Sequence, residues 1–322
     1  MHLTIDRQML WLVEGIVAGL VAASLVGFFL SRQVKSEERR ASVENLNTRI
    51  RAWWIMIGIF ALALLLGSSG SLLLFAFISF LALREYISLI PTRHADHRTL
   101  LWSFFVFTPL QYWILYKQWY GMASIMIPVY AFLFIPMRLV LSRETTGFLD
   151  RAARIHWGLM VCVYCLSYAP ALLILEIPGY QRQSAKLLLF LVMVVQFSDI
   201  FQYVWGKLLG KRKIAPEISP NKTWEGFLGG VATASLIGMG LWWMTPFSPL
   251  LALGMALLAT LLGFAGGLVM SAIKRDRGVK DFGATIQGHG GILDRVDSLC
   301  FSAPVFFHVT RFIFLTSHGR GS

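Results

Sequence analysis

The chain has 322 residues, of which 56% are hydrophobic and 14% are charged, and its mean hydropathy is +0.64. An average soluble domain is roughly 45–50% apolar and about 25% charged, so this composition excludes a soluble globular domain, a disordered chain and a collagen-like chain. Three cysteines are too few for a disulfide framework. The net charge of +12 fits a membrane protein with Lys and Arg in its cytoplasmic loops better than it fits nucleic-acid binding. We therefore expect an all-α, polytopic integral membrane protein that binds no nucleic acid.

Ten segments are apolar enough to be membrane-spanning helices, which need about 20 residues each. They are residues 9–30, 53–67, 72–83, 100–116, 122–141, 157–175, 187–205, 227–244, 250–270 and 300–315. The second and third segments are short, and the glycine- and serine-rich run between them is typical of a tight turn. Hydropathy leaves open whether these two segments are separate short helices or one long bent helix.

Positive charge separates the loops of a ten-span chain into two classes. One class carries 23 Lys and Arg residues and the opposite side carries 5. The positive-inside rule therefore places the first class in the cytoplasm and both termini outside it. The loops of the first class are residues 31–52, 84–98, 138–156, 206–223 and 271–299.

The chain divides into four regions. Residues 1–30 form the first membrane span, and residues 31–52 form a cytoplasmic linker in which Val43, Leu46 and Ile50 have the spacing of an amphipathic helix. Residues 53–186 are N-terminal membrane helices. Residues 187–322 hold most of the polar and glycine-rich motifs, so we expect them to form the catalytic membrane domain.

A first polar cluster begins at Asp199, within an apolar segment where an ionised carboxylate needs a partner or water. It ends in the run 219–226, where Ser219 followed by Pro220 is typical of a helix N-cap with proline in the first turn. Such a helix end presents free N–H groups to an anion. A structural ion pair of Asp199, and ordinary cytoplasmic lysines, remain the alternative explanations.

A second cluster is more specific. Residues 271–298 contain four acids, five Lys or Arg residues, one histidine and five glycines within 28 residues, between two spans. Glycines allow backbone N–H groups to form an anion-binding nest, and Lys and Arg bind phosphate. Asp294 and Asp297 share one face of a helix and could bind Mg²⁺. The combination predicts metal-assisted phosphoryl chemistry at the cytoplasmic face, although His289 alone, or the glycines alone, could be purely structural.

This second cluster is similar to the signature of the phosphatidate cytidylyltransferase (CDP-diacylglycerol synthase) family. Upstream, Asp199 and the run 219–226 resemble the family's other motif in order and spacing, and Arg84-Glu85-Tyr86 is similar to a weaker feature. The strong resemblance covers residues 198–298. Its matching residues in the second cluster are Ser271, Lys274, Arg275, Lys280, Asp281, Gly283, Gly288, His289, Gly290, Gly291, Asp294, Arg295 and Asp297.

The resemblance implies an all-helical, usually dimeric membrane enzyme that condenses CTP with phosphatidate to give CDP-diacylglycerol and pyrophosphate, using Mg²⁺. We expect a homodimer in the bacterial cytoplasmic membrane, with its active site facing the cytoplasm. The expected metal ligands are Asp294 and Asp297. The expected catalytic residues are Asp294, Asp281, Lys280, Arg295 and His289. The expected substrate-binding residues are Asp199, Ser219, Lys222, Thr223, Ser271, Lys274, Arg275, Gly288, Gly290 and Gly291.

Three positions depart from the family pattern. Gln287 replaces a proline, Asn221 replaces a common lysine, and Gly267 stands where the family usually has an acid that binds metal. The last departure leaves open whether the metal site is remodelled, singly occupied or lost. The rival hypothesis is a catalytically degenerate homologue that binds nucleotide or anionic lipid within a lipid-synthesis complex. An ion or lipid transporter would use the same charges as a pathway, but the glycine–histidine signature argues against it.

Overall fold

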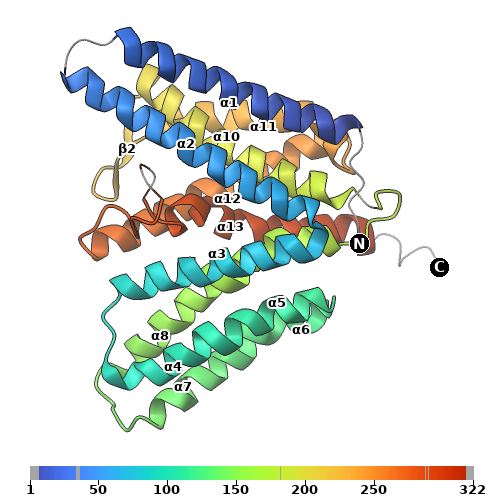
Figure 1. Cartoon of the computed structure of the whole chain (residues 1–322). Helices are drawn as coiled ribbons and strands as arrows, with labels where there is room; N and C mark the ends of the chain where they lie inside the picture. The colour runs from blue at the N-terminus through green and yellow to red at the C-terminus, as the bar shows by residue number, and fades with distance from the viewer. Residues whose placement is uncertain (1–6, 34–36, 182, 287, 289, 317–322) are drawn as a thin grey trace.

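The computed structural model describes residues 7–33, 37–181, 183–286, 288 and 290–316. The N-terminal part is a helical hairpin, in which α1 (Arg7–Gln33) packs along α2 (Glu37–Leu65), and α2 then packs against α3 (Gly67–Leu89) (Figure 1). Gly67 has φ +77°, a left-handed conformation that glycine adopts at little cost and that separates α2 from α3. The two segments that hydropathy left ambiguous are therefore parts of two long helices. Helix α2 continues through residue 52 without a break, and the division into a cytoplasmic linker and a second span stays a prediction.

The next three helical segments are each interrupted by π-helical or 3₁₀ turns. Pro128 lies within one of these interruptions, and Pro109 follows another by two residues. Proline lacks the N–H group that a regular helix would use. The first segment is η1 (His94–Asp96), α4 (His97–Trp102), η2 (Ser103–Phe107) and α5 (Thr108–Tyr116). The second is α6 (Tyr120–Ile125), η3 (Met126–Ala131) and α7 (Phe132–Val140). The third is α8 (Phe148–Leu159), η4 (Met160–Cys165), α9 (Leu166–Ala171) and η5 (Leu172–Ile174).

The C-terminal part consists of four long helices and a small β-hairpin. The hairpin pairs its strands antiparallel, and it is a local exception to the expected all-α architecture, which the described chain otherwise confirms. Helix α10 packs along α11, and α12 packs along α13. The elements are α10 (Ser184–Leu209), β1 (Lys213–Ala215), β2 (Ser219–Thr223), α11 (Trp224–Gly240), η6 (Trp242–Met244), α12 (Pro249–Asp276), α13 (Leu293–Arg311) and η7 (Phe312–Thr316).

The distribution of apolar side chains is that of a membrane protein. A continuous core joins α3, α9, α10, α12 and α13, while large apolar side chains such as Leu73 and Leu250 stay exposed on outer faces. Seven helices in the described chain are long and apolar enough to cross a membrane. The integral membrane prediction is confirmed, and the count of ten spans stays a prediction. The seven are Trp11–Gln33, Val43–Leu65, Gly67–Leu89, Tyr120–Val140, Phe148–Ile174, Ser184–Leu209 and Pro249–Asp276.

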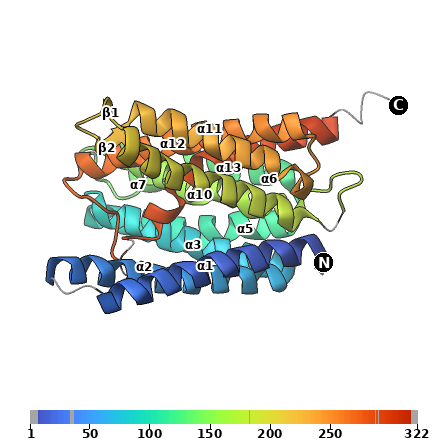
Figure 2. The same ribbon diagram turned by 90° about the horizontal axis from the view of Figure 1, so that it is seen from above.

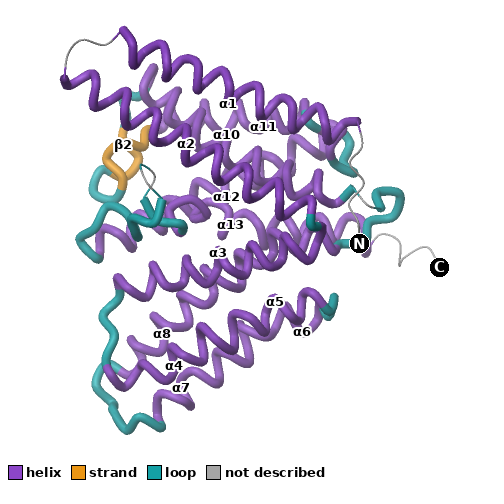
Figure 3. The backbone as a smooth tube through the Cα atoms, viewed as in Figure 1, coloured by secondary structure: helices purple, strands orange, loops and turns teal. Residues whose placement is uncertain are grey.

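The connections of the two predicted charge classes gather at opposite ends of the helix bundle. The connections 90–96 and 141–147 and the described parts 277–286 and 290–292 of the loop before α13 lie at one end together with the β-hairpin. The connections 117–119 and 245–248 lie at the other end (Figures 1 and 2). Figure 3 shows the two strands beside the loop that precedes α13. This arrangement places both sequence motifs at the same end.

Candidate active site

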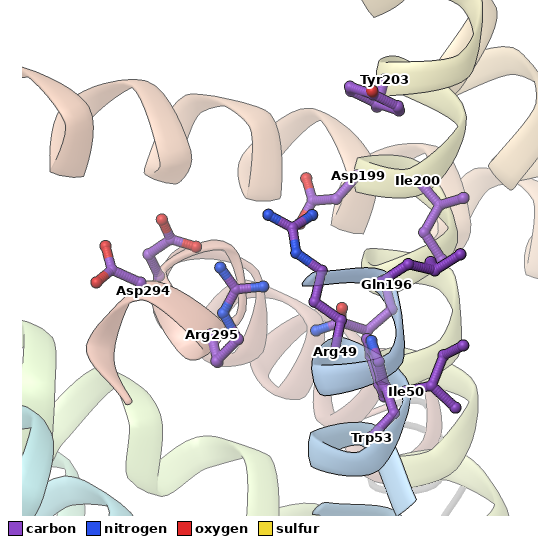
Figure 4. A pocket seen from close by; sticks show the side chains of 11 residues that line it. Arg49, Ile50, Trp53, Gln196, Asp199, Ile200, Tyr203, Asp294 and Arg295 are labelled. Atoms are coloured by element: carbon purple, nitrogen blue, oxygen red, sulfur yellow. The ribbon is translucent and has the colours of Figure 1, made fainter. Parts of the chain in front are cut away.

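Two cavities at the loop-rich end share the side chains of Arg49 and Arg295. Their volumes are about 400 and 530 Å³, within the range of small-molecule sites, which is about 300–1,000 Å³. The first lies between α2, α10 and α13 (Figure 4) and is lined by Leu46, Arg49, Ile50, Trp53, Gln196, Asp199, Ile200, Tyr203, Asp294, Arg295 and Asp297. The second lies between α2 and the glycine-rich loop and is lined by Asn45, Arg49, Lys280, Asp281, Gly283, Ala284, Ile286, Gly288, Gly290 and Arg295.

Ser298 links two carboxylates of the first cavity. Its hydroxyl donates to Asp199 Oδ2 at 3.1 Å, and its backbone N–H donates to Asp297 Oδ1 at 2.7 Å. Since Asp199 is on α10 and Asp297 on α13, this contact also joins the two helices. The cavity therefore holds two neighbouring acids whose remaining oxygen lone pairs can accept a cation.

Asp294 has a different environment. Lys274 Nζ donates to its Oδ1 at 2.7 Å, and the backbone N–H groups of Phe282 and Gly291 donate to its Oδ2 at 2.8 and 2.9 Å. The Asp294 side chain is only 3% exposed. A buried carboxylate with three donors holds the glycine-rich loop against α12 and α13, and the binding of metal by Asp294 stays a prediction.

Glu85 on α3 is the second acid that shapes this loop. Its carboxylate accepts hydrogen bonds from the backbone N–H groups of Ile292 and Leu293, at 3.0 and 2.9 Å, and from the Thr285 hydroxyl at 2.6 Å. Because the free N–H groups at a helix N-terminus favour a negative charge, Glu85 stabilises the start of α13. The residue triplet 84–86 resembled a family feature, but nothing in the sequence indicated this contact.

The glycines of the loop have two separate functions. Gly288 and Gly290 line the second cavity with φ of +74° and +82°, which side chains rarely adopt. Gly291 instead faces Glu85, since a Cβ there would lie 2.4 Å from Glu85 Oε2. Glycine at position 291 is therefore explained by the close packing of Glu85. At positions 288 and 290 it is explained by the positive φ of the backbone that lines the cavity. His289, one of the expected catalytic residues, lies outside the described residues.

The first motif folds differently from the prediction. Ser219 pairs with Ala215 in the β-hairpin, so it is not the N-cap of a helix. The N-cap of α11 is Thr223, whose Oγ1 accepts a hydrogen bond from the Gly226 N–H at 3.1 Å. Pro220 lies in a two-stranded ribbon, where both strands are edges and a missing N–H is tolerated. The N-cap prediction was wrong by four residues.

Lys222 occupies the space beside Gly267, the position where the family usually has an acid. A Cβ at Gly267 would lie 3.0 Å from Lys222 Nζ, and this ammonium also lies 4.6 Å from the centre of the Phe264 ring. Burial holds the pKa of Lys222 below its ordinary value, and the carboxylates of Asp199 and Asp297 only partly oppose this shift. A cation therefore lies where a metal-binding side chain was expected.

Of the expected site residues, the structure gathers eight around the two cavities. Most of the remaining residues bond to neighbouring parts of the chain: Ser271 donates to the Gly267 carbonyl at 2.6 Å, and Arg275 donates to the carbonyls of Ile218 and Val279. Those at the cavities are Asp199, Lys280, Asp281, Gly288, Gly290, Asp294, Arg295 and Asp297. Those lining neither cavity are Ser219, Lys222, Thr223, Ser271, Lys274, Arg275 and Gly291.

Arg49 lines both cavities, but it was not among the predicted site residues. The apolar residues Leu46, Ile50 and Trp53 surround it at helical spacing on one face of α2, so a signal was present in the sequence. An arginine beside apolar residues at helical spacing is typical of an amphipathic helix face rather than of an ordinary charged loop.

A family model and three similar proteins relate this chain to known proteins. The model of the family described as "Cytidylyltransferase family" matches residues 47–313. The chain is 42% identical over 296 residues to "Uncharacterized protein YnbB" of Escherichia coli (strain K12), covering 91% of this chain and 95% of that protein. It is 32% identical over 255 residues to a "Phosphatidate cytidylyltransferase" of Bacillus subtilis (strain 168), covering 79% and 90%. A protein of the same name from Staphylococcus aureus (strain COL) is 36% identical over 170 residues, covering 52% and 61%.

Proposed function

The chain belongs to the cytidylyltransferase family, and we propose that it transfers the cytidylyl group of CTP to phosphatidate, or to a related lipid phosphate, giving CDP-diacylglycerol and pyrophosphate. Family membership makes it a CTP-dependent nucleotidyltransferase. Its apolar helices support an integral membrane protein, and its relatives are proteins of bacteria. The observation that carries the proposal is the pair of cavities joined at Arg295, a residue of the family signature. Relatives named phosphatidate cytidylyltransferase support the choice of lipid.

In the proposed reaction, an oxygen of the lipid phosphate attacks the α-phosphorus of CTP. A bond forms between these two atoms, the bond from the α-phosphorus to the bridging oxygen of the β-phosphate breaks, and pyrophosphate leaves with that electron pair. A phosphate monoester dianion is already nucleophilic at neutral pH, so the reaction needs no strong general base. The protein contributes position, and cations such as Lys280 and Arg295 stabilise the charge that develops on the leaving group.

The carboxylates fit a magnesium ion that is shared with a substrate. Among the described residues, no group of three or more His, Cys, Asp or Glu side chains is arranged to hold a metal by itself. Mg²⁺ usually takes one or two carboxylates together with substrate phosphates, and Asp199 and Asp297 are the neighbouring pair that could supply them. When bound, Mg²⁺ would neutralise charge on phosphate oxygens.

The proposal also includes an active site at the cytoplasmic face of the bacterial membrane and a homodimeric enzyme. Orientation is tested in intact cells, with single cysteines in a chain whose three native cysteines are replaced. A cysteine at Ser219 should be protected from an impermeant thiol reagent added outside, and one at Ser248 should be labelled. The reverse pattern would contradict the orientation. Chemical crosslinking in the membrane, with a dimer band expected, tests the oligomeric state.

The reaction is tested with purified protein, CTP labelled at the α-phosphate and Mg²⁺. Label should enter the lipid phase when phosphatidate is supplied, and a panel of other lipid phosphates should establish the headgroup preference. If the chain binds CTP but labels none of these lipids, the enzyme proposal fails. The rival hypothesis of a binding homologue would then stand.

A further inference from the structure

We propose that Arg49 on α2 binds the phosphate of the lipid substrate at the junction of the two cavities, so that α2 forms part of the substrate site. This inference rests on the proposed function, because it names the cavity that each substrate enters. The first cavity would take the lipid phosphate, and the second would take the nucleotide.

The junction combines two arginines with the carboxylates that line both cavities, and the two arginines can bind an anion. Within the described part of the chain, no hydrogen bond or ion pair engages the guanidinium of either Arg49 or Arg295, and Arg295 Nε is buried with no partner. Figure 4 shows Arg49 extending from α2 and Arg295 extending from α13 into the same space. A buried donor without a partner costs free energy, and two guanidinium groups match the charge and the geometry of a phosphate dianion.

The walls of the first cavity suit a lipid. Five side chains from α2 and α10 contribute apolar surface to this cavity, namely Leu46, Ile50, Trp53, Ile200 and Tyr203. Ile200 is 46% exposed and Tyr203 is 67% exposed, so this side opens onto the apolar outer surface of the helices. A lipid could therefore keep its chains in the bilayer while its phosphate reaches Arg49.

The walls of the second cavity suit a nucleotide. Asn45, Lys280 and Asp281 contribute polar groups, and Gly288 and Gly290 allow close approach of the backbone. Most of the residues that line this cavity belong to the loop between α12 and α13. Because Arg49 and Arg295 line both cavities, a lipid phosphate held there would adjoin the nucleotide phosphates.

Arg51 provides a matched control for Arg49. It is an exposed arginine two residues further along the same helix, and it lines neither cavity. If the positive charge of α2 acted only on the membrane surface, the two arginines would be equivalent. If Arg49 binds the lipid phosphate, only Arg49 should matter.

The experiment measures binding without turnover, so that it does not depend on the proposed reaction. Native mass spectrometry in nanodiscs measures retention of phosphatidate relative to phosphatidylcholine, and equilibrium binding measures affinity for labelled CTP. We expect Arg49→Gln to weaken phosphatidate retention at least about 10-fold, as expected for a lost charge-assisted hydrogen bond. Arg49→Lys should be intermediate, because it keeps the charge without the planar fork. Arg51→Gln should bind both ligands as the parent does, and CTP affinity should stay unchanged in all three variants.

Two outcomes would overturn the inference. One is equal phosphatidate retention in Arg49→Gln and the parent. The other is a loss of CTP binding with phosphatidate retained, which would assign Arg49 to the nucleotide. A thermal unfolding curve of Arg49→Gln that matches the parent shows that any loss is local. If phosphatidate retention depends on Arg49 but the parent transfers no label from CTP, the inference stands and the proposed function fails.

Discussion

The glycine-rich loop before α13 and the helix α2 contribute to the candidate site in opposite ways. In the loop, the Phe282 and Gly291 N–H groups and the Lys274 ammonium are bonded to Asp294, and Glu85 holds the start of the next helix. On α2, Arg49 is outside the second cluster and has no bonded partner among the described residues. Several signature residues therefore hold the site in shape through hydrogen bonds within the protein. The cationic side chains that line the cavities come from both regions, such as Arg49 on α2 and Lys280 in the loop.

Asp294→Asn should have the largest effect, because it leaves Lys274 without its buried partner. Breaking one partner of a buried pair costs about 3–5 kcal/mol, so both thermal stability and activity should fall. Activity, measured as label transferred from CTP to lipid, should fall about 10²-fold or more. Differential scanning fluorimetry in detergent measures Tm.

Asp150→Asn is the control for this substitution. Asp150 forms an exposed ion pair with Arg154 at 2.6 Å, and such pairs contribute about 0–1 kcal/mol. If Asp294→Asn and Asp150→Asn lowered Tm equally, the structural role assigned to Asp294 would be wrong.

Gly267→Asp restores an acid at the position where this chain departs from the family pattern. An unpaired Asp in a membrane helix costs about 2.5–3.5 kcal/mol on insertion scales, but Lys222 Nζ lies next to this position and should pair with the new carboxylate. The single variant should therefore accumulate in the membrane like the parent. Gly267→Asp combined with Lys222→Met should accumulate poorly.

Lys222→Met alone completes this double-mutant cycle. A coupling free energy between the two positions below about 0.5 kcal/mol would contradict the assigned contact. If Gly267→Asp also lowers the Mg²⁺ concentration needed for half-maximal activity, the parent site has fewer metal ligands than the usual family member, as its sequence predicts.

Glu85→Gln should loosen the glycine-rich loop without unfolding the bundle. The amide keeps one acceptor oxygen but loses the charge at the start of α13, a change of about 1.5–3 kcal/mol. Hydrogen exchange of the amides at 291–293 should become faster, and activity should fall about 10-fold. Glu217→Gln, at an exposed position in the β-hairpin turn, is the control. Unchanged exchange in Glu85→Gln would exclude the proposed clamp.

Thr223→Ala should have the smallest effect, because its side chain caps α11 and lines neither cavity. Loss of an N-cap costs about 1 kcal/mol, and Thr223→Ser should restore it. The KM for CTP should stay the same in both variants. A large rise in this KM would return Thr223 to the substrate-binding role that the family resemblance implied.

The parts of the site that depend on local hydropathy and residue spacing were predictable from the sequence. Each of the seven helices that are long and apolar enough to cross a membrane overlaps a segment that hydropathy predicted. The spacing of Asp294 and Asp297 fits the helix on which both lie. Hydropathy did not find the full length of α2, since its first half is charged and still helical. The apolar pattern detects what lies in the bilayer, not where a helix ends.

Contacts between distant parts of the chain were not predictable from these patterns. Glu85 and Leu293 are 208 positions apart, and only folding brings them within 2.9 Å. The cap at Thr223 was missed because Ser219 followed by Pro220 suits a helix start as well as it suits an edge strand. Arg49 was counted as one of several loop charges, although its apolar neighbours were a usable signal.

The central claim, that this chain forms a bond between a lipid phosphate and the α-phosphorus of CTP, is tested most directly by comparing two labels. Purified protein is incubated with phosphatidate and CTP labelled either at the α- or at the γ-phosphate, and the lipid phase and released pyrophosphate are counted. We predict that α-label enters the lipid, that γ-label appears only in pyrophosphate, and that the two products form in equal amounts. γ-label in the lipid, or no label in the lipid from either CTP, would contradict the account.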